Sequence, residues 1–262
     1  MRSAQTLTKP IYPIVGVAGR PLDLQPPSLL FQPHGYSDPL NKAGSGFHEL
    51  FTMWPPVKQE IVQVLIHLGQ YSRVVQHYSP VACSPDVLDL LGDCRNVVHH
   101  RLLSLPNEDD PTESYLQYTE QNDTENELSR EIYLTCRLTA VLYALHVTFP
   151  LPRNQQMRLR NLDALESQIA RLCALNASGP VVLWCAAVAI SMFGDDDPPE
   201  ALVAYMAHLI AYMEVDTLHT LIKMLQTFAW VDAAVQDTWK RMWTTRFFSS
   251  QRPSSAQSAT RL

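Results

Sequence analysis

Residues 218–243 read LHTLIKMLQTFAWVDAAVQDTWKRMW, and this stretch gives the clearest indication of the fold. In its first half, large apolar residues recur three or four positions apart, which places them on one face of a helix. Residues 230–243 hold three of the chain's five tryptophans, whose bulk specifies how a helix packs on a core. The stretch therefore predicts helices near 216–229 and 232–247 that bury Phe228, Trp230, Trp239 and Trp243.

The same apolar spacing recurs along the chain from residue 47 onwards. The chain has only nine glycines, and this low number favours helices, because each glycine costs about 1 kcal/mol in a helix interior. Ser84 and Asp197 stand just before prolines and are predicted to cap the helices that follow. A strand pattern is weak and confined to Ile14–Val17. We therefore predict an all-α fold, an irregular multi-helix bundle of about eight to nine helices, near 47–54, 57–77, 86–105, 126–147, 155–175, 180–193, 198–213, 216–229 and 232–247.

Composition divides the chain into three segments. Residues 1–46 are rich in proline and are predicted to be extended and largely irregular. Residues 47–248 form the predicted helical domain, in which Trp184 is expected to be buried on an apolar helix. Residues 249–262 form a disordered Ser-rich tail.

An acidic loop is predicted within the helical domain, at residues 106–127. It holds eight acidic side chains and no lysine or arginine. A solvated linker is the favoured interpretation. The acids also alternate with Tyr115, Leu116 and Tyr118, which is the composition of a disordered activation segment. Both interpretations remain open at this point.

The net charge and the apolar segments of the sequence limit which partners and which location are expected. A formal net charge of -6 with scattered basic residues argues against direct nucleic-acid binding, which depends on concentrated positive charge. The longest apolar run, 180–193, is shorter than the roughly 20 residues that a membrane-spanning helix needs. The first residues lack the apolar segment of a secretory signal. These features indicate the cytosol or the nucleus and no membrane.

The cysteines do not form a metal-binding or disulfide pattern. There are five, an odd number, and no two have the two-residue spacing from which small zinc sites are built. Cys136 and Cys185 lie on apolar helix faces, where a free cysteine behaves as a small hydrophobe. We therefore expect no zinc module and no cysteine nucleophile.

The sharpest catalytic candidate is the acidic stretch before residue 201. Asp196, Asp197 and Glu200 match the Asp-Asp-x-x-Glu pattern of magnesium-dependent terpenoid synthases, which are also all-α. However, Pro198 and Pro199 belong in the first turn of a helix, where preceding acids favour the helix dipole. A second metal motif is missing, since Asn122-Asp123-Thr124 lacks the required serine and glutamate. A helix cap is the favoured interpretation, with an all-α enzyme as the alternative.

Two further patterns are not expected to form a metal-binding or phosphate-binding site. His99 and His100 follow Cys94, but adjacent histidines on a helix point about 100° apart and do not readily chelate one ion. The segment Gly16–Gly19 lacks the third glycine of a phosphate-binding loop. We predict no catalytic, cofactor-binding or metal-binding residues, no cofactor, and no enzyme activity.

Three stretches, in order, resemble the regulatory domain of fungal-specific transcription factors. One runs from Cys136 through Leu142-Tyr143 to Phe149-Pro-Leu-Pro152, and another is Leu183–Ala187 on an apolar helix. The third is the leucine-spaced helix, the Phe228-x-Trp-x-Asp232 junction and the final Trp-x-x-x-Trp. Together they cover roughly residues 86–247. In that family, the helical domain usually lies C-terminal to a binuclear zinc cluster.

The resemblance implies a transcription regulator in the nucleus that controls a metabolic gene cluster, as in secondary metabolism. The six closely spaced cysteines of the zinc cluster are absent from this sequence. We therefore expect no direct specific DNA binding. Regulation would pass through a protein partner, either another regulator or a coactivator, or through a small-molecule effector held among the helices.

Overall fold

The computed structural model describes residues 42–80, 82–117, 123–148, 155–194 and 196–247, in which helices are joined by turns and irregular segments. The all-α prediction is confirmed, because the described residues hold nine α-helices and no strand. Residues 1–41 and 248–262, including the weak strand pattern at 14–17, lie outside the described residues. The elements are η1 (Ser45–His48), α4 (Glu49–Thr52), α5 (Gln59–Tyr78), α6 (Pro85–Leu103), η2 (Thr112–Ser114), α7 (Asp123–Tyr143), η3 (Ala144–Thr148), α8 (Gln155–Ala174), α9 (Pro180–Phe193), α10 (Glu200–Tyr212), α11 (Leu218–Leu225), α12 (Asp232–Met242) and η4 (Trp243–Phe247).

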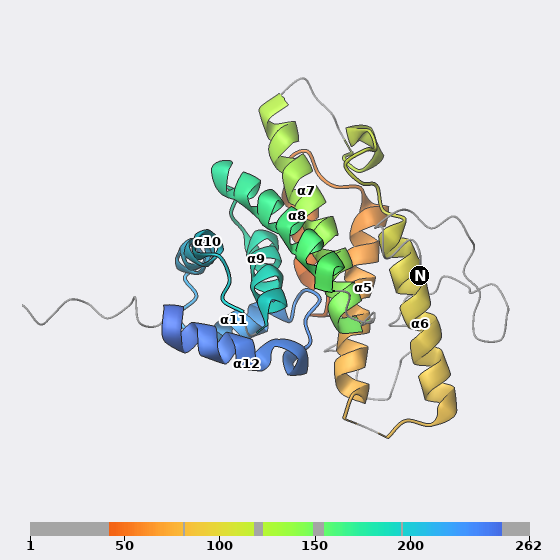
Figure 1. The fold of residues 1–262 in the computed structure, drawn as a ribbon. Helices are drawn as coiled ribbons and strands as arrows, with labels where there is room; N and C mark the ends of the chain where they lie inside the picture. Colours follow the sequence, from red (N-terminus) through yellow and green to blue (C-terminus); the bar gives the residue numbers. More distant parts are fainter. Residues whose placement is uncertain (1–41, 81, 118–122, 149–154, 195, 248–262) are drawn as a thin grey trace, which may run out of the picture.

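Helix α9 lies at the centre of the arrangement. It packs against α7, α8, α10, α12, α4 and η1, while α5 and α6 lie side by side next to α7 (Figure 1). Every residue of α9 from 181 to 190 is buried. Because none of these ten side chains carries a charge, the helix is hydrophobic all round and requires neighbours on every side.

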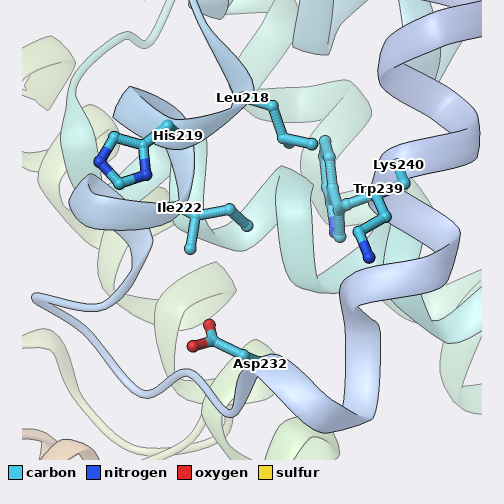
Figure 2. A pocket seen from close by; sticks show the side chains of 6 residues that line it. All are labelled: Leu218, His219, Ile222, Asp232, Trp239 and Lys240. Carbon is cyan, nitrogen blue, oxygen red and sulfur yellow. The ribbon is translucent and has the colours of Figure 1, made fainter.

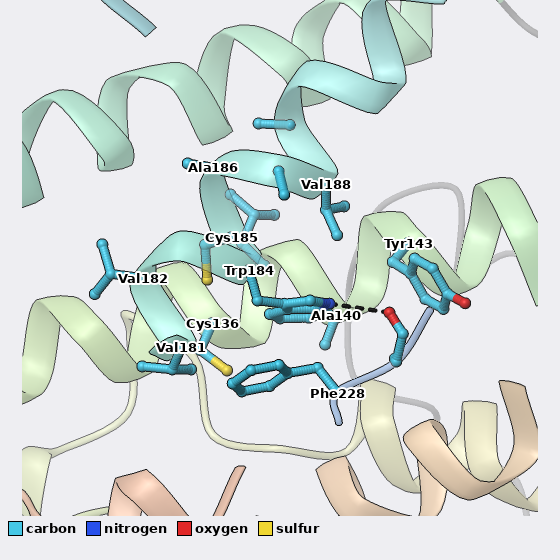
Figure 3. Close-up of a cluster of buried hydrophobic side chains, with 14 of the residues drawn as sticks. Cys136, Ala140, Tyr143, Val181, Val182, Trp184, Cys185, Ala186, Val188 and Phe228 are labelled. Atoms are coloured by element: carbon cyan, nitrogen blue, oxygen red, sulfur yellow. Dashed lines mark hydrogen bonds between the residues drawn. The ribbon is translucent and has the colours of Figure 1, made fainter. Parts of the chain in front are cut away.

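Aromatic rings fix the position of α9 within this core. The indole of Trp184 is fully buried and donates a hydrogen bond of 2.9 Å to the carbonyl of Ala229 (Figure 3). It stacks on Phe228 at 5.8 Å between ring centroids, and both rings contact Phe47 edge to face at 5.1 Å. These pairs join η1, α9 and the turn after α11, three segments far apart in the sequence.

The predicted burial of the aromatic anchors is largely confirmed. Trp184, Phe228, Trp230 and Trp239 are buried, whereas Trp243 is only half-buried. Trp243 lies at the end of the last described helix, where it contacts Phe247 at 6.2 Å between ring centroids.

Close contact between η1 and α5 depends on glycine. A Cβ on Gly69 would lie 2.6 Å from the backbone of Gly44, and Gly44 has a φ of 82°, which other residues adopt only with strain. Residues 43–47 can therefore lie directly on α5, which brings Phe47 to the aromatic cluster.

The described part of the predicted acidic loop, residues 106–117, contains no α-helix, as predicted, but it is neither a freely solvated linker nor a disordered segment. Tyr115 and Leu116 are fully buried, and Tyr115 stacks on Tyr133 of α7 at 4.6 Å between ring centroids. The Tyr115 carbonyl accepts a hydrogen bond of 2.8 Å from the backbone N–H of Lys58. Two apolar side chains among the acids are enough to dock the segment on the core. Residues 118–122 lie outside the described residues, and α7 begins at Asp123.

We predict that Trp184→Ala lowers the free energy of unfolding by about 3–5 kcal/mol, because it leaves a cavity beside Phe47 and Phe228. Denaturant unfolding measures the change. The control is Trp54→Ala, since the Trp54 side chain is 52% exposed and should change stability little. Equal effects of the two substitutions would contradict the central position of Trp184.

Candidate functional site

A pocket of about 400 Å³ lies between α11 and α12 (Figure 2). This volume is within the range of small-molecule sites, which also occur between packed helices. The sequence analysis missed the site, because it interpreted the whole stretch from 218 to 243 as packing. The lining residues are Leu218, His219 and Ile222 from α11 and Asp232, Trp239 and Lys240 from α12.

The start of α12 is fixed by the carboxylate of Asp232. The side-chain amide of Gln226, just after α11, donates to both oxygens of Asp232, at 2.9 and 3.1 Å. The amide of Gln76, near the end of α5, donates to Oδ2 at 2.8 Å. An acidic residue in the first turn also suits the positive end of the helix dipole. Asp232 thus determines how α12 starts relative to α11 and α5.

Trp239 lies beneath the pocket, where its ring is fully buried and held on three sides. Its indole N–H donates a hydrogen bond of 2.8 Å to Ser191 Oγ of α9. Its ring contacts Trp230 and Phe247, each at 6.3 Å between ring centroids. A ring with these contacts cannot turn without disturbing the core, so Trp239 fixes the position of α12 on α9.

Leu218 and Ile222 line the pocket from α11 and are only half-buried. Thr217 precedes α11, and its hydroxyl oxygen accepts a hydrogen bond of 3.1 Å from the N–H of Thr220, which fixes the start of the helix. The other described residues therefore leave part of the apolar face of α11 uncovered.

The charged groups of the pocket differ in their partners. Asp232 accepts hydrogen bonds from two amides, as above. Lys240 is exposed, and its ammonium makes no ion pair within the part of the chain that the structure describes. The described lining residues include no cysteine, serine or threonine. What they offer to a ligand is the apolar surface of Leu218 and Ile222 and the charge of Lys240.

The acidic stretch before α10 contacts a basic side chain from η4. Asp196, Asp197 and Glu200 are all exposed. The guanidinium of Arg246 lies 3.9 Å from a carboxylate oxygen of Asp197 and 3.5 Å from one of Glu200. Among the described residues, no group of three or more His, Cys, Asp or Glu side chains is placed to hold a metal ion.

The prediction that Asp197 caps this helix is wrong. Helix α10 begins at Glu200 with Pro199 in the cap position, and the cap residue makes no side-chain hydrogen bond to the helix. The two prolines keep the chain out of the helical conformation for two residues beyond Asp197. Ser84 does occupy the cap position of α6 ahead of Pro85, but its side chain makes no capping hydrogen bond.

The histidine and cysteine candidates are part of the core. His99 is buried, and one of its ring nitrogens lies 3.0 Å from Thr148 Oγ1. Burial, together with the nearby charge of Arg95, lowers the pKa of His99 to about 4, so the ring is neutral near pH 7. Burial also raises the pKa of the Cys94 thiol to about 12. Neither group is placed to bind a metal with the other described residues.

Cys136 and Cys185 lie together between α7 and α9 (Figure 3). Both are buried. Burial, and then the neighbouring thiol of Cys185, hold the pKa of Cys136 well above its usual value. A protonated, inaccessible thiol is a poor nucleophile. The glycine segment 16–19 lies outside the described residues.

Glu49 is a half-buried acid that the sequence analysis did not single out. Its Oε2 accepts a hydrogen bond of 2.6 Å from the backbone N–H of Val181, in the first turn of α9. Gly179 has a φ of 136°, and any Cβ there would overlap the Glu49 carboxyl. Burial raises the pKa of Glu49 from 4.5 to about 7, against the opposing effect of the Val181 N–H. Glu49 thus caps the central helix from a segment 132 residues away.

Comparison of the chain with models of protein families, with curated proteins and with solved structures found no match in any of the three. The resemblance to the fungal-specific regulatory domain therefore stays a prediction. No helix in the described residues has the length and apolar character needed to cross a membrane.

We predict that Glu49→Gln changes the pH dependence of stability. The folded-state pKa of about 7 exceeds the unfolded value of 4.5, so the stability contributed by the protonated acid is present below pH 4.5 and is lost as pH rises to 7. Glutamine still accepts from Val181 N–H but does not titrate. The stability of the variant relative to the parent should therefore rise between pH 4.5 and 7. Glu60→Gln, at an exposed acid of α5, is the control and should show no such trend.

Replacement of Asp196 and Asp197 by Asn and of Glu200 by Gln should change the free energy of unfolding by less than about 1 kcal/mol, because exposed ion pairs contribute little. Titration calorimetry should detect no tight magnesium binding in parent or variant. Magnesium-dependent turnover of a prenyl diphosphate, lost in the variant, would contradict this prediction.

Proposed function

We propose that this chain is a regulatory domain that binds a small molecule between α11 and α12 and acts on transcription through a protein partner. The observation that carries the ligand site is the pocket of about 400 Å³, which the half-buried side chains of Leu218 and Ile222 line. The assignment to transcription, to the nucleus and to a metabolic gene cluster rests on the family resemblance of the sequence.

The contacts of α12 provide a route from the pocket to the surface. Helix α12 continues into η4, whose Phe247 stacks on Trp239. Arg246 of the same turn lies against Asp197 and Glu200 at the start of α10. A ligand that contacts both α11 and α12 binds only when the two helices keep their present spacing. It would therefore stabilise one arrangement of η4 and of the exposed residues beside it.

The charge of the chain supports action through a partner rather than on DNA. A net charge of -6 and the absence of six closely spaced cysteines remove the usual sources of DNA affinity. The enzyme alternative has less support, because Arg246 lies against two of its three candidate carboxylates.

A thermal-unfolding screen of chemically diverse small molecules tests the ligand site. A true ligand at one hundred times its Kd should stabilise the chain by about 2.7 kcal/mol. The same ligand should lose this effect in Ile222→Trp, whose larger ring fills the pocket. The control is Leu88→Trp, at an exposed position of α6, which should respond like the parent.

Stabilisation that persists in Ile222→Trp, with unchanged affinity, would contradict the proposed site. The proposed site would also be contradicted if the screen found no ligand that stabilises Leu88→Trp more than Ile222→Trp.

Fluorescence titration with DNA at physiological salt tests the other part of the proposal, that the chain acts through a protein partner. Sequence-selective nanomolar binding by the purified chain alone would overturn the requirement for a partner.

A further inference from the structure

We propose that the exposed face of α10 is a docking surface for the protein partner, which contacts it with an amphipathic helix that carries lysine or arginine at one end of its apolar face. The inference rests on the proposed function, because it names the surface and the chemistry of the partner. It is carried by the lack of charge along α10, by the exposure of its outer face, and by the acids at one end of that face.

Helix α10 is uncharged along its length and lies at the edge of the molecule. Residues 201–213 include no aspartate, glutamate, lysine or arginine. A helix that is apolar all round is normally buried on every side, yet α10 packs on α9 and α8 and leaves its outer face exposed (Figure 1). The exposed face of α8, by contrast, carries charges at Arg160, Asp163 and Arg171. The outer face of α10 therefore has the composition of a covered surface.

The outer face is a strip of small side chains that ends in two rings. Tyr212 is 60% exposed, and the ring of His208 stacks on it at 6.5 Å between ring centroids. The other exposed side chains between residues 201 and 212 are those of Ala201, Ala204, Ala207 and Ala211. Alanines let a second helix approach to about 8–10 Å between the axes, and the rings add apolar area for it to bury.

A helix suits this strip better than an extended segment does. The backbone of α10 makes its hydrogen bonds within the helix, and the polar side chains of the strip are those of His208 and Tyr212. An extended segment would therefore lose the hydrogen bonds that its backbone makes with water. A helix satisfies its own backbone and can bury an apolar face on such a surface.

Charges beside the strip select a basic partner. Glu214 and Asp216 follow α10 directly, are exposed, and make no ion pair within the described part of the chain. No lysine or arginine occurs between residues 201 and 222, and the negative end of the α10 dipole lies at the same place. Acids at the other end are partly neutralised by Arg246. Basic residues of the partner therefore belong beside Glu214, and the net charge of -6 attracts them.

A second copy of the chain fits the same face less well. In a parallel pair of α10 helices, Glu214 and Asp216 of the two copies would meet. In an antiparallel pair they would meet Asp197 and Glu200, which already contact Arg246. Acids therefore face acids in both directions.

Fluorescence anisotropy of labelled helical peptides with the full chain tests the inference. Each peptide has about 18 residues, enough to cover the strip. The first has an apolar face and three lysines in its last turn, the second has glutamines in place of the lysines, and the third has the composition of the first with its apolar residues spread all round. The lysine peptide should bind about fivefold more tightly than the glutamine peptide. The spread peptide should not saturate.

Substitutions on the strip and beside it separate apolar docking from charge. Ala204→Lys should weaken both helical peptides about tenfold or more, because its ammonium would be buried in the contact. The control is Ala164→Lys, at an exposed alanine of α8, which should change binding by less than about twofold.

The double variant Glu214→Gln, Asp216→Asn should weaken the lysine peptide about fivefold and leave the glutamine peptide unchanged. Asp86→Asn with Asp89→Asn removes the same charge from exposed positions of α6 and should change neither. Thermal unfolding of each variant checks that the fold is retained.

Four outcomes would overturn the inference. They are absence of binding by the lysine peptide, equal binding of the lysine and spread peptides, equal effects of Ala204→Lys and Ala164→Lys, and equal effects of the two double variants. Dimers in sedimentation velocity that dissociate in Ala204→Lys would also overturn it, because a second copy would then cover the face. None of these outcomes involves the pocket between α11 and α12, which the screen and Ile222→Trp test separately.

Discussion

Burial of α9 on all sides is the constraint on which the rest of the structure depends. A helix without charged side chains between 181 and 190 cannot face water, so six other elements pack around it. Its first N–H groups still need acceptors, because no side chain of its own caps it. The carboxyl of Glu49 supplies one of them, and Gly179 leaves room for that carboxyl. The same packing brings Trp184 to Phe47 and Phe228 and so places the turn that follows α11.

The candidate pocket is a consequence of how α11 and α12 attach to this centre. Helix α12 is held at its start by Asp232 and in its middle by Trp239, which bonds to Ser191 of α9. Helix α11 is short, and Leu218 and Ile222 on its apolar face remain half-buried. Two helices fixed at these points leave a space between them rather than closing on each other. The space is lined by Leu218 and Ile222, with Asp232 and the exposed Lys240 beside them.

Local patterns in the sequence predicted the helices well, because apolar spacing and prolines act within a few residues. Helices α5, α6, α8 and α9 begin and end within about two residues of the predicted bounds. Burial of Trp184 and Trp239 followed from the same spacing. The docked acidic segment could not be predicted in this way, since Tyr115 pairs with Tyr133 and Lys58 across long stretches of chain. The pocket depends on Gln76 and Asp232, which are 156 residues apart.

The central claim is that the functional site lies between α11 and α12. Hydrogen–deuterium exchange, measured with and without a small molecule that stabilises the folded chain, tests this claim most directly. The account predicts slower exchange of backbone amides in α11 and α12 when the molecule is bound, with no change in α6, which does not line the pocket. Protection confined to α5 and α6, or unchanged exchange in α11 and α12, would contradict it.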